Sequence, residues 1–294
     1  MTVAEQATLD RVSPLAGPKS AAPAAPAQAS AAPAQAPAAR PGLGWLAGWI
    51  VPVLFFATWE LASRQEWISS RLFPPPSAVA QTIYALGLSG ELALHVWATL
   101  HRVLLGFGCG VAAGTILGAL TGYSTLSKRL LDPSLQALRS IPPLAWVPLF
   151  ILWLGIFETS KVTLIGVGVF FPVYLNLAGA IHGVDRKLVE VGRMYRFTGL
   201  ELVRYVLLPA ALPSYMIGVR NGLGLGWMFV VAAELMGASE GLGFLQIDGQ
   251  MTSRPAVILA SIVLFAVLGK LTDGLLALAG RRLLYWQDSF KPNA

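Results

Sequence analysis

The sequence is poor in charge, in cysteine and in histidine. Only 12% of its 294 residues are charged, against about 25% in an average soluble domain. The single cysteine, Cys109, excludes a disulfide scaffold, and the three histidines have no metal-site spacing. Neither a phosphate-binding GxxxxGK(S/T) loop nor a Gly-x-Ser-x-Gly motif occurs. We therefore expect no catalytic residue, no metal site and no cofactor, and no ATP hydrolysis by that route.

Apolar residues dominate instead. They make up 55% of the chain, and the mean hydropathy is +0.63. Too few charges remain to cover a soluble globule of this size, so the composition indicates an all-α, polytopic integral membrane protein. The net charge of +6 is more typical of Lys and Arg retained on the cytoplasmic side than of a nucleic-acid partner, and none is expected.

Six apolar segments are candidates for transmembrane helices, each of which needs about 20 mostly apolar residues. They are residues 43–62, 92–122, 141–156, 162–181, 212–238 and 256–279. The third contains Pro142, Pro143 and Pro148, which make it irregular. Broken helices at membrane depth are tolerated against protein or a water-filled cavity. A position along a transport path and a short helix starting at the interface both remain open.

The ends of the chain differ from this apolar middle. Residues 1–42 are rich in Ala and Pro and precede the first apolar run, which predicts a disordered cytoplasmic tail and not a signal peptide. Residues 43–91 hold the first expected span and an outside stretch. In that stretch Ser77 follows three prolines and is expected to cap a short helix over 78–86.

The distribution of positive charge sets an expected orientation. Most Lys and Arg residues fall in segments 1–42, 123–140, 182–211 and 280–294. The alternate segments hold only Arg64, Arg71, Lys161 and Arg254. The positive-inside rule therefore predicts that both termini are cytoplasmic.

Glycines recur every four residues along the second expected span. The stripe consists of Gly106, Gly110, Gly114, Gly118 and Gly122. The fifth expected span has Gly218, Gly222 and Gly226 at the same spacing. Small residues at this spacing let helices approach closely in a membrane. Packing within the chain and packing at a homodimer or moving interface both remain open.

Charged residues inside spans cost about 2.5–3.5 kcal/mol each on insertion scales, so they should face protein or a cavity. Arg220 and Glu234 share a helix face but lie roughly 21 Å apart, so they cannot pair. Lys270 and Asp273 are three residues apart and are expected to pair locally. The candidate path residues are Arg220, Asn221, Glu234 and Arg102. Two interpretations remain open: they line the transport path, or they form buried polar contacts between helices.

The segment 183–213, between the fourth and fifth expected spans, is long and patterned. Leu188, Val191 and Tyr195 recur at helical spacing among charged residues. Thr198-Gly199 breaks this helix, and a second short helix is expected to stop near Pro209. Two short helices around a tight turn would form a compact knob suited to a cleft on a soluble partner.

This segment resembles the EAA loop of ABC importer permeases. Glu190 takes the glutamate position, Gly192 stands in place of the second alanine, and Leu208-Pro209 takes the closing Leu-Pro position. Arg196 stands where the family usually has a glycine. The resemblance implies coupling to an ATPase through Glu190, Val191, Gly192, Arg193, Arg196, Phe197, Thr198, Gly199, Leu208 and Pro209.

The resemblance extends over residues 43–288 and is greatest to the nitrate/sulfonate/taurine branch, in particular to aliphatic sulfonate permeases. It rests on six stretches that begin at Leu135, Val147, Phe171, Gly183, Ala232 and Leu268. It implies a type I importer core over residues 92–280, preceded by one extra helix and followed by a cytoplasmic tail, 281–294. Aliphatic sulfonates are the expected substrate, and taurine, nitrate or bicarbonate remain alternatives.

The family's architecture implies the partners. We expect a homodimer of permease chains in the inner membrane, two cytoplasmic ABC ATPase subunits that bind the EAA loops, and a periplasmic substrate-binding protein. Two other classes stay open from the residues alone: an autonomous secondary carrier or channel, and a membrane anchor without transport. The sequence shows no internal repeat of the kind typical of carriers, which argues against the first class. The intramembrane charges argue against the second.

Overall fold

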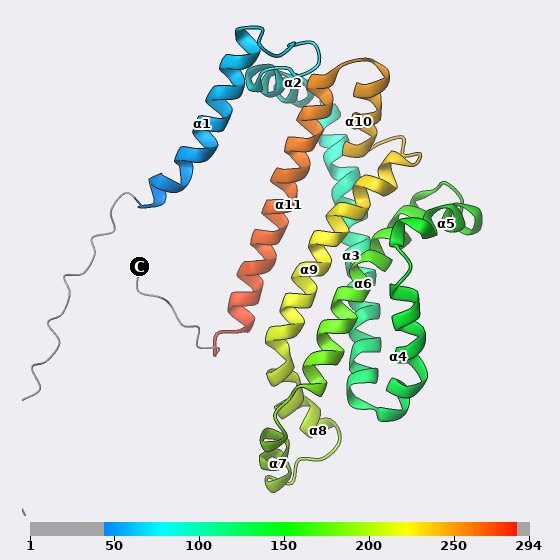
Figure 1. Ribbon diagram of the computed structural model, residues 1–294. Coiled ribbons are helices and arrows are strands. Elements are labelled where there is room, and N and C mark those ends of the chain that lie inside the picture. Colours follow the sequence, from blue (N-terminus) through cyan, green and yellow to red (C-terminus); the bar gives the residue numbers. More distant parts are fainter. Residues whose placement is uncertain (1–43, 287–294) are drawn as a thin grey trace, which may run out of the picture. The chain divides into compact units, whose positions relative to one another are not determined.

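The computed structural model describes residues 44–286, and all regular elements of that range are helices (Figure 1). They are α1 (Gly44–Arg64), α2 (Pro76–Ser89), α3 (Glu91–Tyr123), α4 (Thr125–Arg139), η1 (Pro143–Trp146), α5 (Val147–Leu154), α6 (Glu158–His182), α7 (Arg186–Met194), α8 (Leu200–Leu202), η2 (Val203–Leu207), α9 (Leu208–Leu235), α10 (Leu242–Met251) and α11 (Pro255–Leu283). The predicted tail 1–42 and residues 287–294 of the second tail lie outside the described residues.

Four helical stretches of the described range are long and apolar enough to cross a membrane. They are α3, α6, η2 with α9, and α11, with lengths of 33, 25, 33 and 29 residues. They correspond to the second, fourth, fifth and sixth expected spans. The first expected span coincides with α1, whose crossing of the bilayer stays a prediction.

The third expected span, 141–156, is wrong in its boundaries. Its place is taken by two helical pieces bent by 90° at residues 140–142: α4 on one side, η1 with α5 on the other. Ser124 ends α3 and caps α4, where its hydroxyl accepts from the backbone N–H of Ser127 at 3.2 Å. The break follows from Pro142 and Pro143, because the residue before a proline disfavours helix. Arg139 therefore lies at the far end of α4, about 22 Å from the α3–α4 turn, and not in an inside loop.

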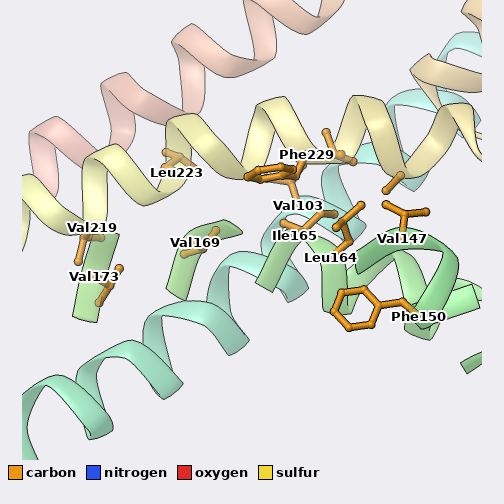
Figure 2. Close-up of a cluster of buried hydrophobic side chains, with 12 residues drawn as sticks. Val103, Val147, Phe150, Leu164, Ile165, Val169, Val173, Val219, Leu223 and Phe229 are labelled. Atoms are coloured by element: carbon orange, nitrogen blue, oxygen red, sulfur yellow. The ribbon is translucent and has the colours of Figure 1, made fainter. Parts of the chain in front are cut away.

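The core centres on α6, which is sandwiched between α3 and α9. Figure 2 shows Val103 of α3, Ile165 and Val169 of α6, and Phe229 of α9 converging in one apolar cluster. All four side chains are buried. Together with the short α5, these three helices form the interior against which the candidate site residues are held.

Glycines bring α3 against α6. A Cβ atom added at Gly110 would lie 2.6 Å from the carbonyl oxygen of Gly166, and one at Gly114 would lie 2.9 Å from that of Phe170. On the other side of α6, a Cβ at Gly218 of α9 would lie 2.9 Å from the carbonyl oxygen of Pro172. Both glycine stripes therefore face α6 within this chain, at separations that a side chain would prevent.

The helix expected at 78–86 exists but is longer, and Ser77 does not cap it. α2 begins at Pro76, a first-turn position that suits proline because no backbone N–H is needed there. The Ser77 hydroxyl instead donates to Glu60 Oε1 at 2.8 Å, and its backbone N–H donates to Glu60 Oε2 at 3.1 Å. Ser77 thus ties α2 to the end of α1.

Candidate functional site

The segment that follows α6 and runs into the start of α9 (residues 183–213, hereafter the coupling loop) folds as two helical pieces around a turn. Asp185 caps α7, its carboxylate accepting from the backbone N–H of Lys187 at 2.9 Å. α7 ends at Met194, and α8 begins at Leu200 and runs into η2. The predicted break at Thr198-Gly199 is therefore found between the two pieces.

Two residues of this turn have left-handed backbone conformations. Gly199 has φ +51°, and Arg196 has φ +62°. Arg196 occupies the position where the resembled family usually has glycine, which adopts positive φ without steric cost. Arg196 thus adopts the left-handed conformation that glycine favours, which is uncommon for a residue with a Cβ.

Gly192 lets the two pieces of the coupling loop pack together. A Cβ at this buried residue would lie 2.8 Å from Leu202 Cδ1 and 2.9 Å from Val206 Cγ2. The half-buried Phe197 ring packs near Tyr195 and Tyr205, with ring centroids 6.1 and 5.3 Å away. The coupling loop is therefore a packed unit with its own small interior.

A face of α7 adjacent to Gly192 is apolar and exposed. Leu188 and Val191 are about half exposed, and Met194 is 83% exposed. Glu190 lies beside them and accepts a hydrogen bond from Arg186 Nε at 3.0 Å, with both side chains largely exposed. Arg193 and Thr198 are exposed as well. An apolar face with a charged border is what a helix offers to a groove on another protein.

The expectation that the second short helix stops near Pro209 is wrong. η2 and α9 form one continuous helical run, in which Leu208 is exposed and Pro209 sits in the first turn of α9. The five-residue π-helical stretch directly before it changes the hydrogen-bonding pattern, so the missing N–H of the proline leaves the run intact. The coupling loop is thus joined directly to α9.

A cluster of buried charged residues lies at the C-terminal end of α9, the end far from the coupling loop. Arg102 of α3 is 4% exposed and Glu234 of α9 is fully buried, with Arg102 Nη1 and Glu234 Oε1 2.8 Å apart. Glu234 also accepts hydrogen bonds from the Thr99 hydroxyl and from the backbone N–H of Gly243. The two candidate path residues Arg102 and Glu234 are thus partners that join α3 to α9.

Sequence reasoning missed two further members of this cluster, Glu158 and Lys161 in the first turn of α6. Arg102 Nη2 donates to Glu158 Oε1 at 2.8 Å, and Lys161 Nζ donates to the same oxygen at 2.9 Å. Their i, i+3 spacing at the start of an apolar segment was a readable signal for a local pair. The contact of Glu158 with Arg102, 56 residues earlier in the chain, could be found only from the tertiary structure.

The other two candidate path residues lie elsewhere on α9. Arg220 forms a bidentate pair with Asp273 of α11, at 2.5 Å from Nε and 2.7 Å from Nη2. The expected local pair of Lys270 with Asp273 is therefore wrong, because the planar guanidinium fork of Arg220 matches both carboxylate oxygens. Arg220 and the adjacent Asn221 are exposed, so they do not share a site with Glu234. Within residues 44–286, no three His, Cys, Asp or Glu side chains gather as a metal site would require.

The chain is similar in sequence to known transport proteins. A family model described as binding-protein-dependent transport system inner membrane component matches residues 110–285. The chain is 42% identical over 252 residues to the aliphatic sulfonates transport permease protein SsuC of Bacillus subtilis (strain 168), covering 86% of this chain and 91% of that protein. It is 35% identical over 241 residues to the taurine transport system permease protein TauC of Escherichia coli (strain K12), covering 80% of this chain and 86% of that one.

One solved structure adds a likeness in fold. A chain of the MetNI methionine ABC transporter in an inward-facing conformation matches with a TM-score of 0.55 and 23% identity. The match covers 68% of this chain and 97% of that chain.

Proposed function

The chain belongs to the family of binding-protein-dependent transport system inner membrane components, and on that premise we propose that it forms the translocation path of an ATP-driven importer. ATP is hydrolysed in a separate subunit. The observation that carries this proposal is the coupling loop, whose exposed apolar face on α7 has Glu190 beside it. This face docks into a groove of the ATPase. The continuous run from η2 into α9 then transmits motion of the ATPase to a membrane-spanning helix.

The proposed substrate is an aliphatic sulfonate. The support is the 42% identity with a relative that bears this name, over most of both chains. Taurine remains the first alternative because a taurine permease is 35% identical, and nitrate or bicarbonate follow from the sequence resemblance. All of these substrates are small and carry an anionic group.

The assembly consists of two copies of this chain, two cytoplasmic ATPase subunits and one periplasmic substrate-binding protein. Both termini and the coupling loop face the cytoplasm, where most Lys and Arg residues of the expected loops lie. The α5 and α10 ends of the helices face the periplasm and receive substrate from the binding protein. Arg220, Asn221, Glu234 and Arg102 remain the proposed path residues, with Arg220 and Asn221 on an exposed part of α9.

Sulfur-limited growth tests the substrate. A strain lacking this chain is offered an alkanesulfonate, taurine or sulfate as its single sulfur source. We expect loss of growth on the alkanesulfonate alone. Loss on taurine alone would move the assignment to taurine, and normal growth on all three sources in a strain without a redundant system would contradict sulfonate import.

The autonomous carrier or channel is the competing class, and its energetics separate it from the importer. If the chain belongs to an importer, an ATPase co-purifies with it and vanadate inhibits uptake. Vanadate-insensitive uptake by the purified chain alone would favour the carrier.

A further inference from the structure

Two buried cations share one exposed carboxylate at the N-terminal end of α6. The side chains of Arg102 and Lys161 are 4% and 8% exposed, whereas that of Glu158 is 57% exposed. Arg102 reaches Glu158 through both Nε and Nη2, and Lys161 adds a third hydrogen bond at 2.9 Å. Buried positive charge here is therefore balanced by a group that itself remains in contact with solvent.

Arg102 has further partners, whereas the carboxylate of Glu158 is held by Arg102 and Lys161. Arg102 Nη1 also donates to Glu234 Oε1 and to the carbonyl oxygen of Glu240, at 2.8 and 2.6 Å. These contacts hold the guanidinium in place whether or not Glu158 is bound. Within the described residues, the hydrogen bonds to the Glu158 side chain all come from Arg102 and Lys161. Glu158 can therefore swing out while Arg102 stays in place, and the buried Lys161 is then left without its carboxylate partner.

The charge balance shows what would replace Glu158. Arg102 and Lys161 are offset by Glu234 and Glu158, and these four charges sum to zero. When Glu158 leaves, one uncompensated positive charge stays buried, which is costly unless a monoanion takes its place. The first turn of the 25-residue α6 adds backbone N–H groups and a helix dipole that favour negative charge.

We propose that Arg102 and Lys161 form a binding site for a monovalent oxyanion, occupied in this structure by the carboxylate of Glu158. A sulfonate group displaces Glu158 and takes over its hydrogen bonds, since the guanidinium fork fits planar carboxylate and tetrahedral oxyanions alike. The choice of sulfonate rests on the proposed function, whereas the anion site itself does not.

The surroundings limit what the site recognises. An apolar cavity of about 20 Å³ adjoins it, lined by Lys161, Ser160, Phe150 and Met236 among others. This volume holds about one water molecule, so the site has no room for an alkyl chain on that side. On this side, the site therefore contacts the charged group of the ligand and not its alkyl chain.

Anion binding to the purified full-length chain in lipid nanodiscs tests the proposal. The probe is methanesulfonate, compared at constant ionic strength with the uncharged dimethyl sulfone, and the readout is the shift of the thermal unfolding midpoint. In Glu158→Ala the internal competitor is gone, so we expect methanesulfonate to bind at least about tenfold more tightly than to the wild type. Glu158→Gln, which keeps the side-chain shape without the charge, is expected to lie between the two.

Asp248→Ala is the matched control, because Asp248 pairs with the exposed Arg254 and its loss changes the net charge equally. A methanesulfonate response of Glu158→Ala and Glu158→Gln that is no larger than that of Asp248→Ala would overturn the anion site. Equal shifts with dimethyl sulfone would do the same. Binding in this assay does not depend on transport. If methanesulfonate binds tightly but the growth test fails, the anion site is supported and the assignment as a sulfonate importer is refuted.

Discussion

Arg102 and Arg220 are both arginines in apolar helices, yet their surroundings separate their roles. Arg102 is buried and bound to two carboxylates and a carbonyl oxygen. The Arg220 side chain is 53% exposed, and within the described residues it pairs with Asp273. The buried cluster fixes the Arg102 guanidinium in position, where the exposed Glu158 carboxylate can be exchanged, whereas the Arg220 guanidinium is itself exposed. At the scale of single residues, Arg102 thus belongs to a fixed, buried anion site, and Arg220 is the candidate for contact with an anion that passes the exposed side of α9.

A double variant separates the two roles of Arg220. Arg220→Gln leaves Asp273 unpaired, and the double variant Arg220→Gln/Asp273→Asn removes both charges. If Arg220 attracts the anionic substrate, uptake falls by about tenfold, which equals about 1.4 kcal/mol, and stays low in the double variant. The measurements are uptake in cells and the unfolding midpoint of the purified chain. If both uptake and stability recover in the double variant, Arg220 has a structural role only, as the partner of Asp273 that joins α9 to α11.

At the scale of helices, the close approach of α3 and α9 to α6 depends on small residues. In α3 the buried glycines face α6, while Gly108 on the other side of the same helix has nothing within 4 Å of its would-be Cβ. In a membrane, helix association depends on packing rather than on exclusion of water. The contact is therefore sensitive to single methyl groups on one face and tolerant of them on the other.

Gly110→Ala and Gly108→Ala form a matched pair two residues apart. The Gly110 methyl would meet the carbonyl oxygen of Gly166 at 2.6 Å, so the helices must separate, and overpacking of this kind costs about 1–3 kcal/mol. Gly108→Ala is expected to leave stability unchanged or slightly raised, because alanine favours helix. Thermal unfolding of the two purified variants in one detergent measures the difference. Equal midpoints for both would show that the α3–α6 contact adjusts freely.

At the scale of the whole chain, the coupling loop and the buried charge cluster lie at opposite ends of α9. Leu208, within the coupling loop, begins this helix, and Glu234 stands one residue before its end. Motion imposed on the coupling loop thus reaches the Arg102–Glu234 pair through 28 residues of one helix. We infer that uptake and ATP hydrolysis are linked along this helix.

Glu190→Ala tests that link. Removal of a carboxylate at the border of the exposed α7 face should leave membrane insertion intact but weaken co-purification of the ATPase or uncouple its hydrolysis from uptake. Glu201→Ala serves as a control, since Glu201 is also an exposed glutamate of the coupling loop. Normal uptake with normal ATPase retention in Glu190→Ala would refute the proposed role of this residue.

The sequence by itself determined the membrane class, four of the expected spans and the two-piece coupling loop. These features depend on local composition and spacing: runs of apolar residues, glycines every four residues, and a break at Thr198-Gly199. Such signals act over one or two helical turns and can be read from neighbouring residues. The family resemblance followed from the same short stretches.

Only the tertiary structure decided which distant residues meet. Asp273 pairs with Arg220, 53 residues away, instead of Lys270, and Arg102 meets Glu158 and Glu234 from two other helices. It also showed that α4 and α5 together replace the third expected span, and that Pro209 leaves the run from η2 to α9 unbroken. A charge in an apolar helix needs a partner, but its own segment does not specify which one; the rotation and depth of the packed helices select it.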